Sequence, residues 1–457
     1  MSAYGLPCWT GQVGRIVTPA MSPDPTLYTA RIRAAGNLAA RLLAGPWSLD
    51  AIAASIHAAM RAVHDRTRAA LAVRVFALGE DTYPPAPRVL ADSLCHSEYF
   101  KPDPDPVFAA ALESPRFAPI APFAGLAIPS LATVGELASW LALSAEQLDW
   151  LSDERRGHGR SREATLQHYR YTYVSKRIGP PRLIEAPKLR LKSIQRRILH
   201  EILDAVPVHA SAHGFIAGRS CLTGAHIHAN EAVVATFDLA QFFPAIGRPR
   251  VHGLFRCLGY PWAVARRLTG LCSSVTPASV AQGLSALYRV PHLPQGAPTS
   301  PALANLLAWP LDRRLAGLAK AAGAHYTRYA DDLAFSGDDA FARGLARFSA
   351  TVDTIVREEG FTLNADKTRI MRRGSRQRVT GIVVNAHCNV GRAEFDTLKA
   401  ILFNCVRHGP AGQNKAGVTD FRRHLDGRVS WAEQIGPGRG VKLRALFDRI
   451  EWDTGQA

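Results

Sequence analysis

The feature that most constrains this chain is a pair of adjacent carboxylates, Asp331 and Asp332, in the run HYTRYADDLAFSG at residues 325–337. An Asp-Asp pair is most often the start of a turn, because short polar side chains bond to the nearby backbone and interrupt strands. The flanking aromatic and aliphatic residues nevertheless favour strands, and the next strong turn signal, Gly337, comes only after them. The pattern therefore predicts a β-hairpin that carries both carboxylates at its tip.

Carboxylates crowded at a hairpin tip repel one another, which raises their pKa values unless a cation neutralises them. Mg²⁺ suits such a site, because it takes one or two protein carboxylates and completes its shell with waters and substrate phosphates. A third carboxylate, Asp238, ends a second predicted strand at residues 233–237. Two such strands side by side would bring Asp238, Asp331 and Asp332 together, and three carboxylates can hold two metal ions about 4 Å apart for in-line attack on a phosphate. The pattern predicts a site for nucleotidyl transfer.

The charge of the chain indicates what such a site would act on. Its 457 residues carry a formal net charge of +17, and 47% of them are hydrophobic, so the chain can bury a large core and form more than one domain. Residues 1–128 contain 11 Lys and Arg residues against 10 Asp and Glu residues, so a net charge of +16 falls on residues 129–457. We therefore expect a polyanionic partner that binds the second part of the chain.

Cysteine usage and hydropathy indicate the compartment. The seven cysteines are scattered without a Cys-x-x-Cys pair, which predicts neither a zinc site nor a disulfide framework and is typical of a reducing cytoplasm. The first residues, MSAYGLPCWTGQVGRIV, lack a basic segment followed by an apolar one, so no signal peptide is predicted. Polar residues or prolines interrupt each long uncharged run, so none would make a good membrane helix. We expect a soluble cytoplasmic protein with no membrane partner.

Residues 1–128 are predicted to form a mainly helical N-terminal extension, whose role the sequence leaves open. Residues 48–76 carry apolar side chains at helical spacing, and Ser48 is placed to cap that helix. The proline-rich segment 83–108 is predicted to be an irregular connector, which puts the domain boundary between about 105 and 130. The stretch 133–153 is predicted to form two short helices whose apolar residues pack in a core.

A basic hairpin is predicted next. Three alternating tyrosines from Tyr169 onward indicate a strand, a Gly-Pro-Pro turn follows, and a basic helix begins at about residue 189. Lys176 and Arg182 flank the turn. These two cations either lie on a solvated hairpin edge or reach a triphosphate, whose developing charge Lys and Arg can neutralise.

Four motifs in residues 133–457 resemble, in their order and spacing, those of the reverse transcriptases. FDLAQFF looks like the first, LPQGAPTSPALANLLAWPLD (293–312) the second, RYADDLAF the third and GFTLNADKTRI (360–370) the fourth. The resemblance implies an α+β right-hand polymerase with fingers, a palm built on an antiparallel sheet, and a helical thumb, preceded by the N-terminal extension. Fingers and palm would occupy residues 129–385, and residues 386–457 would form a basic, RNA-binding thumb.

The same resemblance implies roles for side chains in the first and third motifs. Asp238, Asp331 and Asp332 would be catalytic. Together with the backbone carbonyl of Leu239 they would hold two Mg²⁺ ions, for which Mn²⁺ is a possible substitute. Phe243 would lie under the sugar of the nucleotide and exclude a 2′-hydroxyl, which selects deoxynucleotides.

The second and fourth motifs complete the expected nucleotide site. By resemblance, Gln295 begins a loop that packs on the incoming base and the template. Lys367 matches the lysine assigned to protonating the pyrophosphate leaving group, although a surface salt bridge is an alternative. With Lys176, Arg182 and Phe243, these two residues form the predicted nucleotide-binding set.

A short segment before the first motif resembles the retron branch of bacterial reverse transcriptases. Retron enzymes carry Asn-Ala-x-x-His ahead of the first aspartate. Ala225 and His228 match that pattern in GAHIHANEAVVATFD, whereas Gly224 replaces the asparagine. His228 and its neighbour His226 have no third nitrogen or sulfur ligand nearby, so RNA contact or structural hydrogen bonding is predicted rather than a metal site.

The run VTGIVVN adds a second resemblance to the retron branch. Its triplet Val379-Thr380-Gly381 matches a signature that is associated with recognising the cognate RNA. From the residues alone, a simple turn at Thr380 and Gly381 is equally plausible.

Basic residues recur in the tail and include Arg422 and Arg423, and aromatic residues are interleaved with them. Aromatic rings stack on unpaired bases while cations follow phosphates, so the tail is predicted to bind RNA. The alternative is an amphipathic helix whose aromatic residues belong to a core, and for Phe447 we prefer that interpretation.

The combined interpretation is an RNA-directed DNA polymerase that copies part of a cognate structured non-coding RNA into a branched RNA-DNA hybrid, the retron msDNA. By resemblance it would use dNTPs, prime from a 2′-hydroxyl of a guanosine, and act in anti-phage defence with an effector protein as a possible partner. The alternatives are an intron-encoded or abortive-infection reverse transcriptase and an RNA-binding scaffold with a vestigial polymerase. The three intact aspartates argue against the scaffold. An independent toxin in residues 1–128 is a further alternative.

Overall fold

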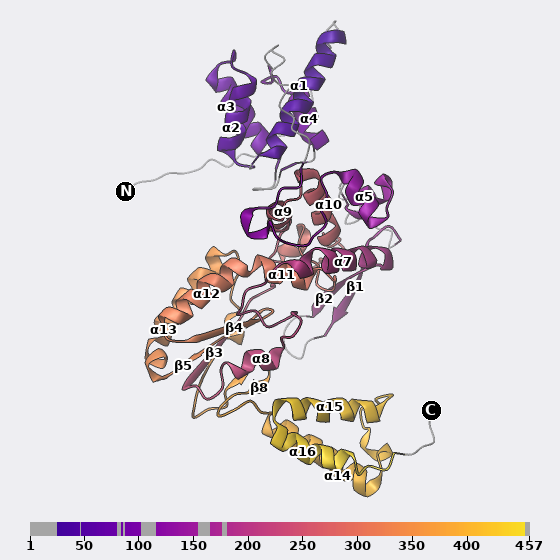
Figure 1. Cartoon of the computed structure of the whole chain (residues 1–457), viewed down its shortest axis with the longest axis vertical. Coiled ribbons are helices and arrows are strands. Elements are labelled where there is room, and N and C mark those ends of the chain that lie inside the picture. Colours follow the sequence, from indigo (N-terminus) through magenta and orange to yellow (C-terminus); the bar gives the residue numbers. More distant parts are fainter. Residues whose placement is uncertain are drawn as a thin grey trace. The chain divides into compact units, whose positions relative to one another are not determined.

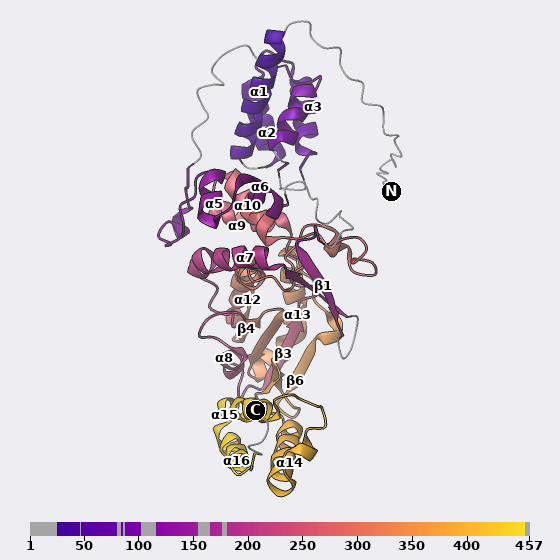
Figure 2. The same ribbon diagram turned by 90° about the vertical axis from the view of Figure 1, so that its right-hand side faces the viewer.

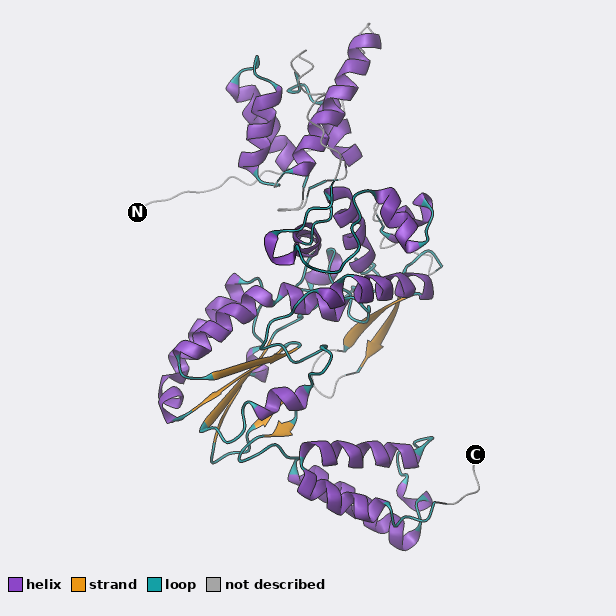
Figure 3. Cartoon of the chain, in the orientation of Figure 1, coloured by secondary structure: helices purple, strands orange, loops and turns teal. Residues whose placement is uncertain are grey.

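The computed structural model describes residues 25–45, 47–79, 84–85, 87–101, 116–153, 165–175 and 181–452. Contacts along the chain divide it into two compact units, Met1–Pro115 and Arg116–Ala457. In the described residues, the first unit contains helices joined by loops, and the second contains helices and three small antiparallel sheets (Figure 3). The mixture of helices with antiparallel sheet confirms the predicted α+β class.

The described residues of the first unit form the helices α1 (Pro25–Ala44), α2 (Leu49–Ala59), α3 (Asp65–Phe76) and α4 (Pro87–His96) (Figure 1). Ser48 caps α2 as predicted, because its hydroxyl accepts a hydrogen bond from the backbone N–H of Ala51. The single helical pattern over 48–76 forms two helices, since the chain leaves the helical conformation at Met60. Buried apolar residues from all four helices form the interior, among them Leu38, Ile52, Leu71 and Leu90.

The prediction of an irregular connector over 83–108 was wrong for residues 87–96, which form α4. Proline is well tolerated at the first position of a helix, where its missing N–H has no partner in any case, so Pro87 begins α4 rather than preventing it. Leu90 and Leu94 are fully buried in the helical unit. The guanidinium of Arg31 in α1 donates to the carbonyl oxygens of Cys95 and Ser97, which fixes the end of α4.

The second unit opens with the short 3₁₀ helix η2 (Ala121–Phe123) and the helices α5 (Val134–Leu141) and α6 (Ala145–Leu151). Thr133 caps α5, and Ser144 caps α6 with a complete capping box to Gln147. Both helices bury leucines, which confirms the two short core helices predicted at 133–153.

The predicted basic hairpin is also present. Strands β1 (Tyr169–Val174) and β2 (Arg182–Pro187) pair antiparallel, and α7 (Leu189–Glu201) follows them. Next along the chain come η3 (Leu203–Ala205) and the short helix α8 (Cys221–His226).

A four-stranded antiparallel sheet forms the centre of the second unit. Its strand order is β4 (His325–Tyr329), β5 (Asp332–Gly337), β3 (Val233–Asp238) and β6 (Arg369–Arg372). Figure 1 shows α12 (Trp309–Ala321) and α13 (Asp339–Glu358) on one face of this sheet and α8 on the other. β3 is therefore buried on both faces. The remaining helices before β4 are α9 (Arg248–Cys257), α10 (Trp262–Cys272), η4 (Ala286–Arg289) and α11 (Ser300–Leu307).

The two faces of β3 belong to different cores. Val233, Ala235 and Phe237 pack into the main core with residues of α13, whereas Val234 packs into a second core that includes the C-terminal helices. Alternating side chains of a strand point to opposite faces, so β3 joins both cores. After β3 the chain continues through the region of α9 to α12 before it returns to the sheet in β4.

The C-terminal part of the second unit follows the 3₁₀ turn η5 (Ala365–Lys367) and strand β6. The two-residue strands β7 (Arg378–Val379) and β8 (Ile382–Val383) form a tight hairpin. Helices α14 (Arg392–His408), α15 (Phe421–Ile435) and α16 (Pro437–Phe447) then pack together, with η6 (Ala411–Gln413) between the first two (Figure 2). Phe447 is buried in their core, as we preferred. In the described part of the chain, no helix combines the length and the apolar character needed to cross a membrane.

Candidate active site at the tip of the β4–β5 hairpin

The structure brings the three predicted carboxylates to one end of the central sheet. β3 ends at Asp238, and the antiparallel register places Asp238 directly opposite Asp332, the first residue of β5. Asp331 lies in the two-residue connection between β4 and β5, and its carbonyl accepts a hydrogen bond of 2.9 Å from the N–H of Leu239. The hairpin tip and the end of β3 are thus joined through the backbone as well as through strand pairing.

Burial and neighbouring negative charges raise the pKa values of Asp331 and Asp332. Burial raises the pKa of Asp331, the charge of Asp238 raises it further, and the cations Lys367 and Arg182 partly oppose the increase. Partial desolvation, followed by the charges of Asp331 and Asp238, raises the pKa of Asp332 to about 6. The tip is therefore a concentration of negative charge that favours a bound cation.

The cation that contacts Asp238 in the structure is the ammonium of Lys367. Its Nζ lies 2.7 Å from Oδ2 of Asp238, whose side chain is only 7% exposed, whereas the lysine side chain is 53% exposed. The sequence left a salt bridge open as an alternative for Lys367, and the structure contains that salt bridge. Among the residues that the structure describes, no three His, Cys, Asp or Glu side chains converge as a ready-made metal site. Oxygen donors of this kind nevertheless fit Mg²⁺.

A buried ionic network supports the hairpin from beneath. Arg328 in β4 is fully buried, and its Nε and NH2 groups donate to the two carboxylate oxygens of the equally buried Asp312 at 2.8 and 2.6 Å. Its NH1 group donates to the side-chain oxygen of Asn305 and to the carbonyl of Ala330, which has a left-handed φ of 55° at the tip. Tyr326 adds a hydrogen bond to Asp312. The interaction with Ala330 anchors the residue that precedes Asp331.

Sequence reasoning missed this network, although one signal was visible. Arg328 is a charged residue in the middle of the strand-forming run HYTRY, where burial requires a partner. Its partners lie in α11 and α12, and no sequence spacing indicates that these helices pack under β4.

The predicted nucleotide-binding residues lie on several elements. Arg182 is exposed at the start of β2, and its charge acts on Asp331. The carbonyl of Gln295 accepts a hydrogen bond of 2.8 Å from the N–H of Glu185, so the loop that Gln295 begins is joined to β2. Phe243 is half-buried and contacts the rings of Phe242 and Phe215. The prediction for Lys176 lies outside the described residues.

Glu185 itself is buried beneath this loop. One carboxylate oxygen accepts from the hydroxyl of Thr276 at 2.7 Å, and the other lies 2.9 Å from Nε2 of His292. The side chain is therefore fully satisfied, and its backbone connects β2 to the Gln295 loop. Sequence reasoning did not identify Glu185 as a residue that positions this loop.

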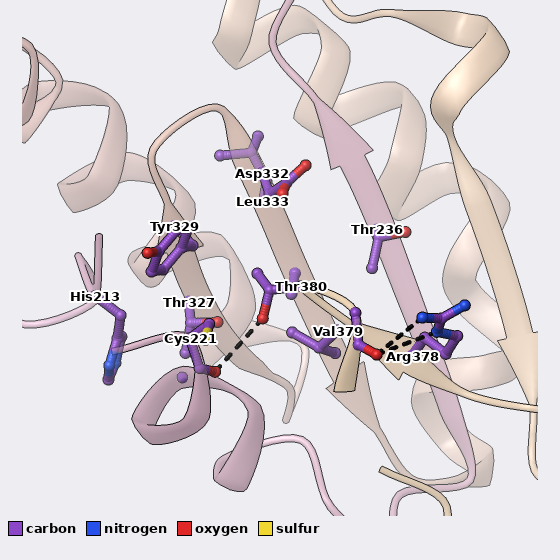
Figure 4. Close-up of a pocket in the computed structure, with 13 residues that line it drawn as sticks. His213, Cys221, Thr236, Thr327, Tyr329, Asp332, Leu333, Arg378, Val379 and Thr380 are labelled. Carbon is purple, nitrogen blue, oxygen red and sulfur yellow. Dashed lines mark hydrogen bonds between the residues drawn. The ribbon is translucent and has the colours of Figure 1, made fainter. Parts of the chain in front are cut away.

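A cavity of about 490 Å³ opens beside the carboxylates (Figure 4). Tyr329 and Asp332 line it from the hairpin, Cys221 from α8, and Thr380 and Gly381 from the β7–β8 turn. Thr380 and Gly381 both have positive φ values, 46° and 90°, which is the conformation of a tight two-residue hairpin turn. The hydroxyl of Thr380 donates to the carbonyl of Cys221 over 3.4 Å, which connects the turn to α8. The structure contains the turn that the sequence left open as an alternative at these residues.

The residues predicted to contact RNA fall into two groups. Val379, Thr380 and Gly381 all line the cavity, although Val379 is almost fully buried in the C-terminal core. Arg422 and Arg423 are exposed on α15.

His228 is fully buried, and this position corrects the expectation that it contacts RNA. Its Nδ1 lies 2.8 Å from the hydroxyl of Ser336 and its Nε2 lies 2.7 Å from the hydroxyl of Thr327. Burial, together with the smaller effects of the charges of His325 and His213, lowers the pKa of His228 to about 3, so the ring is neutral near pH 7. The structural hydrogen bonding that the sequence left open is the role that the structure supports.

Comparisons with known proteins identify the family of the segment that contains this site. Residues 174–394 match the reverse transcriptase (RNA-dependent DNA polymerase) family. The chain is 44% identical over 283 residues to the retron Mx65 reverse transcriptase of Myxococcus xanthus, an alignment that covers 61% of this chain and 64% of that protein. It is 37% identical over 333 residues to the retron Mx162 reverse transcriptase of the same organism, with 69% and 66% covered.

A third relative is the retron Ec86 reverse transcriptase of Escherichia coli, which is 32% identical over 293 residues, covering 63% of this chain and 83% of that protein. The matched segment is that of a reverse transcriptase. More particularly, the chain belongs to the retron reverse transcriptases. It spans somewhat less than two thirds of the length of the two M. xanthus relatives.

Proposed function

We propose that this protein is an RNA-directed DNA polymerase that copies part of a cognate structured non-coding RNA into a branched RNA-DNA hybrid, the retron msDNA. The observation that carries the proposal is the register that sets Asp238 opposite Asp332, with Asp331 beside them at the hairpin tip. Membership of the retron reverse transcriptases supports the substrate class. In this proposal the second unit is a right-hand polymerase, with β1, β2 and α7 in the fingers, the central sheet in the palm and α14 to α16 in the thumb.

The three aspartates and the carbonyl of Leu239 would hold two Mg²⁺ ions, or Mn²⁺ ions as substitutes. When bound, the ions would activate the attacking hydroxyl and neutralise charge on the transferred phosphoryl group. The raised pKa values of Asp331 and Asp332 support this assignment, because they report negative charge that lacks a sufficient counter-ion.

The side chains around the carboxylates would bind and orient the dNTP. Arg182, together with Lys176, would pair with the triphosphate, and Gln295 would pack on the base. Lys367 is exposed enough to leave Asp238 and donate a proton to the pyrophosphate leaving group. Phe243 would lie against the sugar and exclude a ribonucleotide.

The cavity beside Asp332 is suited to the nucleotide that carries the attacking hydroxyl. It lies next to the carboxylates, and its volume is within the range of pockets that hold small ligands. In the first step that nucleotide would be a guanosine of the RNA with a free 2′-hydroxyl. In later steps it would be the nucleotide at the end of the growing DNA. Thr380 and Gly381 would contact it, and Arg422 and Arg423 would bind phosphates further along the RNA.

Family membership also supports a role in anti-phage defence with an effector protein. The effector would be a separate partner or would lie in residues 1–128, of which residues 1–115 form a separate unit whose described part contains helices α1 to α4. Deleting the catalytic function should then abolish protection in a phage plaque assay in the native host, because the RNA-DNA hybrid would no longer form.

The test is to purify the full-length protein from its native host and to analyse the nucleic acid that accompanies it. A matched variant carries Asp331→Asn and Asp332→Asn, which preserve side-chain size. We expect DNA covalently joined to RNA in the wild type only. RNA bound equally to both proteins with no DNA in either would indicate a scaffold, and DNA synthesis on arbitrary primed templates without a bound RNA would indicate a different kind of reverse transcriptase.

A further inference from the structure

Phe215 has an unusual backbone conformation next to the candidate active site. Its φ is +62°, in the left-handed region that bulky residues rarely adopt, and its side chain is 51% exposed. The backbone of Phe215 is therefore strained, and its large apolar ring is exposed to solvent. Such outliers gather at functional sites, where the surrounding contacts hold them in place.

The contacts that hold this conformation come from the hairpin and from the network beneath it. The carbonyl of Gly214 accepts a hydrogen bond of 2.8 Å from the buried side chain of Asn305, which also binds Arg328. A Cβ atom at position 214 would lie only 2.8 Å from the backbone nitrogen of Ala330, so this segment lies directly against the hairpin tip. The N–H of His213 donates to the carbonyl of Arg328 over 2.7 Å, which fixes the segment along β4.

The ring of Phe215 lies between two aromatic residues of the site. Its centroid is 6.3 Å from the ring of Phe243 and 6.3 Å from the ring of Tyr329. Phe243 also contacts Phe242, which is buried, at 5.6 Å. Phe243 therefore contacts one buried ring, Phe242, and one exposed ring, Phe215. Both separations fall in the range in which aromatic pairs attract each other.

We infer that Phe215 is a positioning residue that fixes the ring of Phe243, so that discrimination between deoxynucleotides and ribonucleotides depends on both rings. A ring that excludes a hydroxyl does so only while it cannot swing aside. The buried Phe242 blocks one direction of rotation, and the exposed Phe215 blocks another. The strained backbone is needed because an extended residue at position 215 would direct its side chain elsewhere. This inference rests on the proposed function, since it assumes that Phe243 faces the sugar of the nucleotide.

The test uses the full-length protein with an annealed RNA template and DNA primer, and compares kcat/KM for dGTP with that for GTP. We expect Phe215→Ala to lower the preference for dGTP over GTP roughly 2- to 12-fold. This fold-change corresponds to the interaction free energy of one aromatic pair, which the variant loses. Phe215→Tyr retains the ring and should retain the wild-type ratio. In a Phe243→Ala background, adding Phe215→Ala should change the ratio no further, because Phe215 acts through Phe243.

Several outcomes would overturn the inference. If Phe215→Ala lowers kcat/KM for dGTP and GTP equally, the residue only supports the structure. If the losses in the double variant multiply, Phe215 contacts the nucleotide independently. If Phe243→Ala leaves the ratio unchanged while DNA synthesis continues, the role assigned to Phe243 is wrong and the inference fails with it. A wild-type protein that extends no primer with any nucleotide would instead contradict the polymerase proposal itself.

Discussion

Lys367 and Asp238 form an ion pair in which Nζ of the lysine lies 2.7 Å from Oδ2 of the carboxylate. The carboxylate is almost fully buried and the lysine is half-exposed, so the lysine is the partner that can move away. A divalent cation and Lys367 would therefore compete for Asp238. Release of Lys367 by the cation would place a proton donor next to the departing pyrophosphate.

Replacing Lys367 separates its competition with the divalent cation from its role as a proton donor. Lys367→Met removes the competing cation and the proton donor, so we expect incorporation to slow by roughly 10²-fold while the Mg²⁺ concentration for half-maximal rate falls. Lys367→Arg retains a positive charge but does not release a proton at ordinary pH. This variant should therefore incorporate nucleotides as slowly as Lys367→Met, while its Mg²⁺ concentration for half-maximal rate should stay near that of the wild type. Steady-state rates over a Mg²⁺ titration measure both quantities. Wild-type rates in both variants would exclude a role as acid.

Asp332 should lower the stability of the metal-free protein near neutral pH. Its pKa is about 6 in the folded state against a usual 3.8, so the folded state binds this proton more tightly than the unfolded state does. The resulting gain in the free energy of unfolding is present at low pH and is lost as the pH rises through about 6. Because the side chain is partly open to solvent, the full shift overstates the effect. We expect Asp332→Asn to raise the free energy of unfolding by on the order of 1 kcal/mol at pH 7.5.

Urea unfolding in EDTA at pH 7.5 and at pH 4.5 checks this prediction. The advantage of Asp332→Asn over the wild type should shrink at the lower pH, where the folded wild type already carries the proton. A variant that is less stable than the wild type at pH 7.5 would show that the carboxylate makes a favourable interaction in the absence of metal.

The buried pair of Arg328 and Asp312 should be far more sensitive to single replacement than to joint replacement. Arg328→Met leaves the Asp312 charge buried without its partner, which we expect to lower the free energy of unfolding by about 3–5 kcal/mol. The joint variant Arg328→Met, Asp312→Leu should recover much of that loss. It should nevertheless remain slow in incorporation, because the carbonyl of Ala330 has lost its donor. Chemical denaturation and rate measurements on the same preparations separate the two effects, and full activity in the joint variant would contradict the anchoring role.

Two buried histidines should make the protein acid-sensitive. His228 and His252 both have pKa values of about 3 when folded, well below the 6.5 of the unfolded chain, so stability falls as the pH drops below 6.5. Each should contribute about 1.4 kcal/mol per pH unit between pH 6 and pH 4. His228→Gln should reduce the slope by one such contribution.

Unfolding free energies measured at several pH values give this slope. His226→Gln is the matched control, because His226 is exposed two residues away and its replacement should leave the slope unchanged. An unchanged slope in His228→Gln would mean that His228 is protonated in the folded state.

The elements that position the carboxylates could be predicted because their signals are local. β3 ends at Asp238 and the hairpin turns between Tyr329 and Asp332, since aromatic and β-branched residues alternate up to a polar residue at each point. We predicted that the two strands lie side by side because three carboxylates can then share bound cations. The Thr380–Gly381 turn was also visible in the sequence.

Contacts between distant segments were not predictable from spacing. The partners of Arg328 are 16 and 23 residues away in helices whose packing is set by the whole core. His228 was read as a possible RNA contact because nothing local shows that Thr327 and Ser336 surround it. The left-handed backbone of Phe215 depends on Asn305 and Ala330, and α4 begins at a proline that local composition alone assigned to a connector.

The most direct test of the central claim is incorporation of labelled dNTPs by the isolated protein together with the RNA that accompanies it, in Mg²⁺. The account predicts a labelled product that RNase shortens but does not remove, and that disappears in the Asp331→Asn, Asp332→Asn variant. Absence of label in the wild type, or equal label in the wild type and the variant, would contradict it.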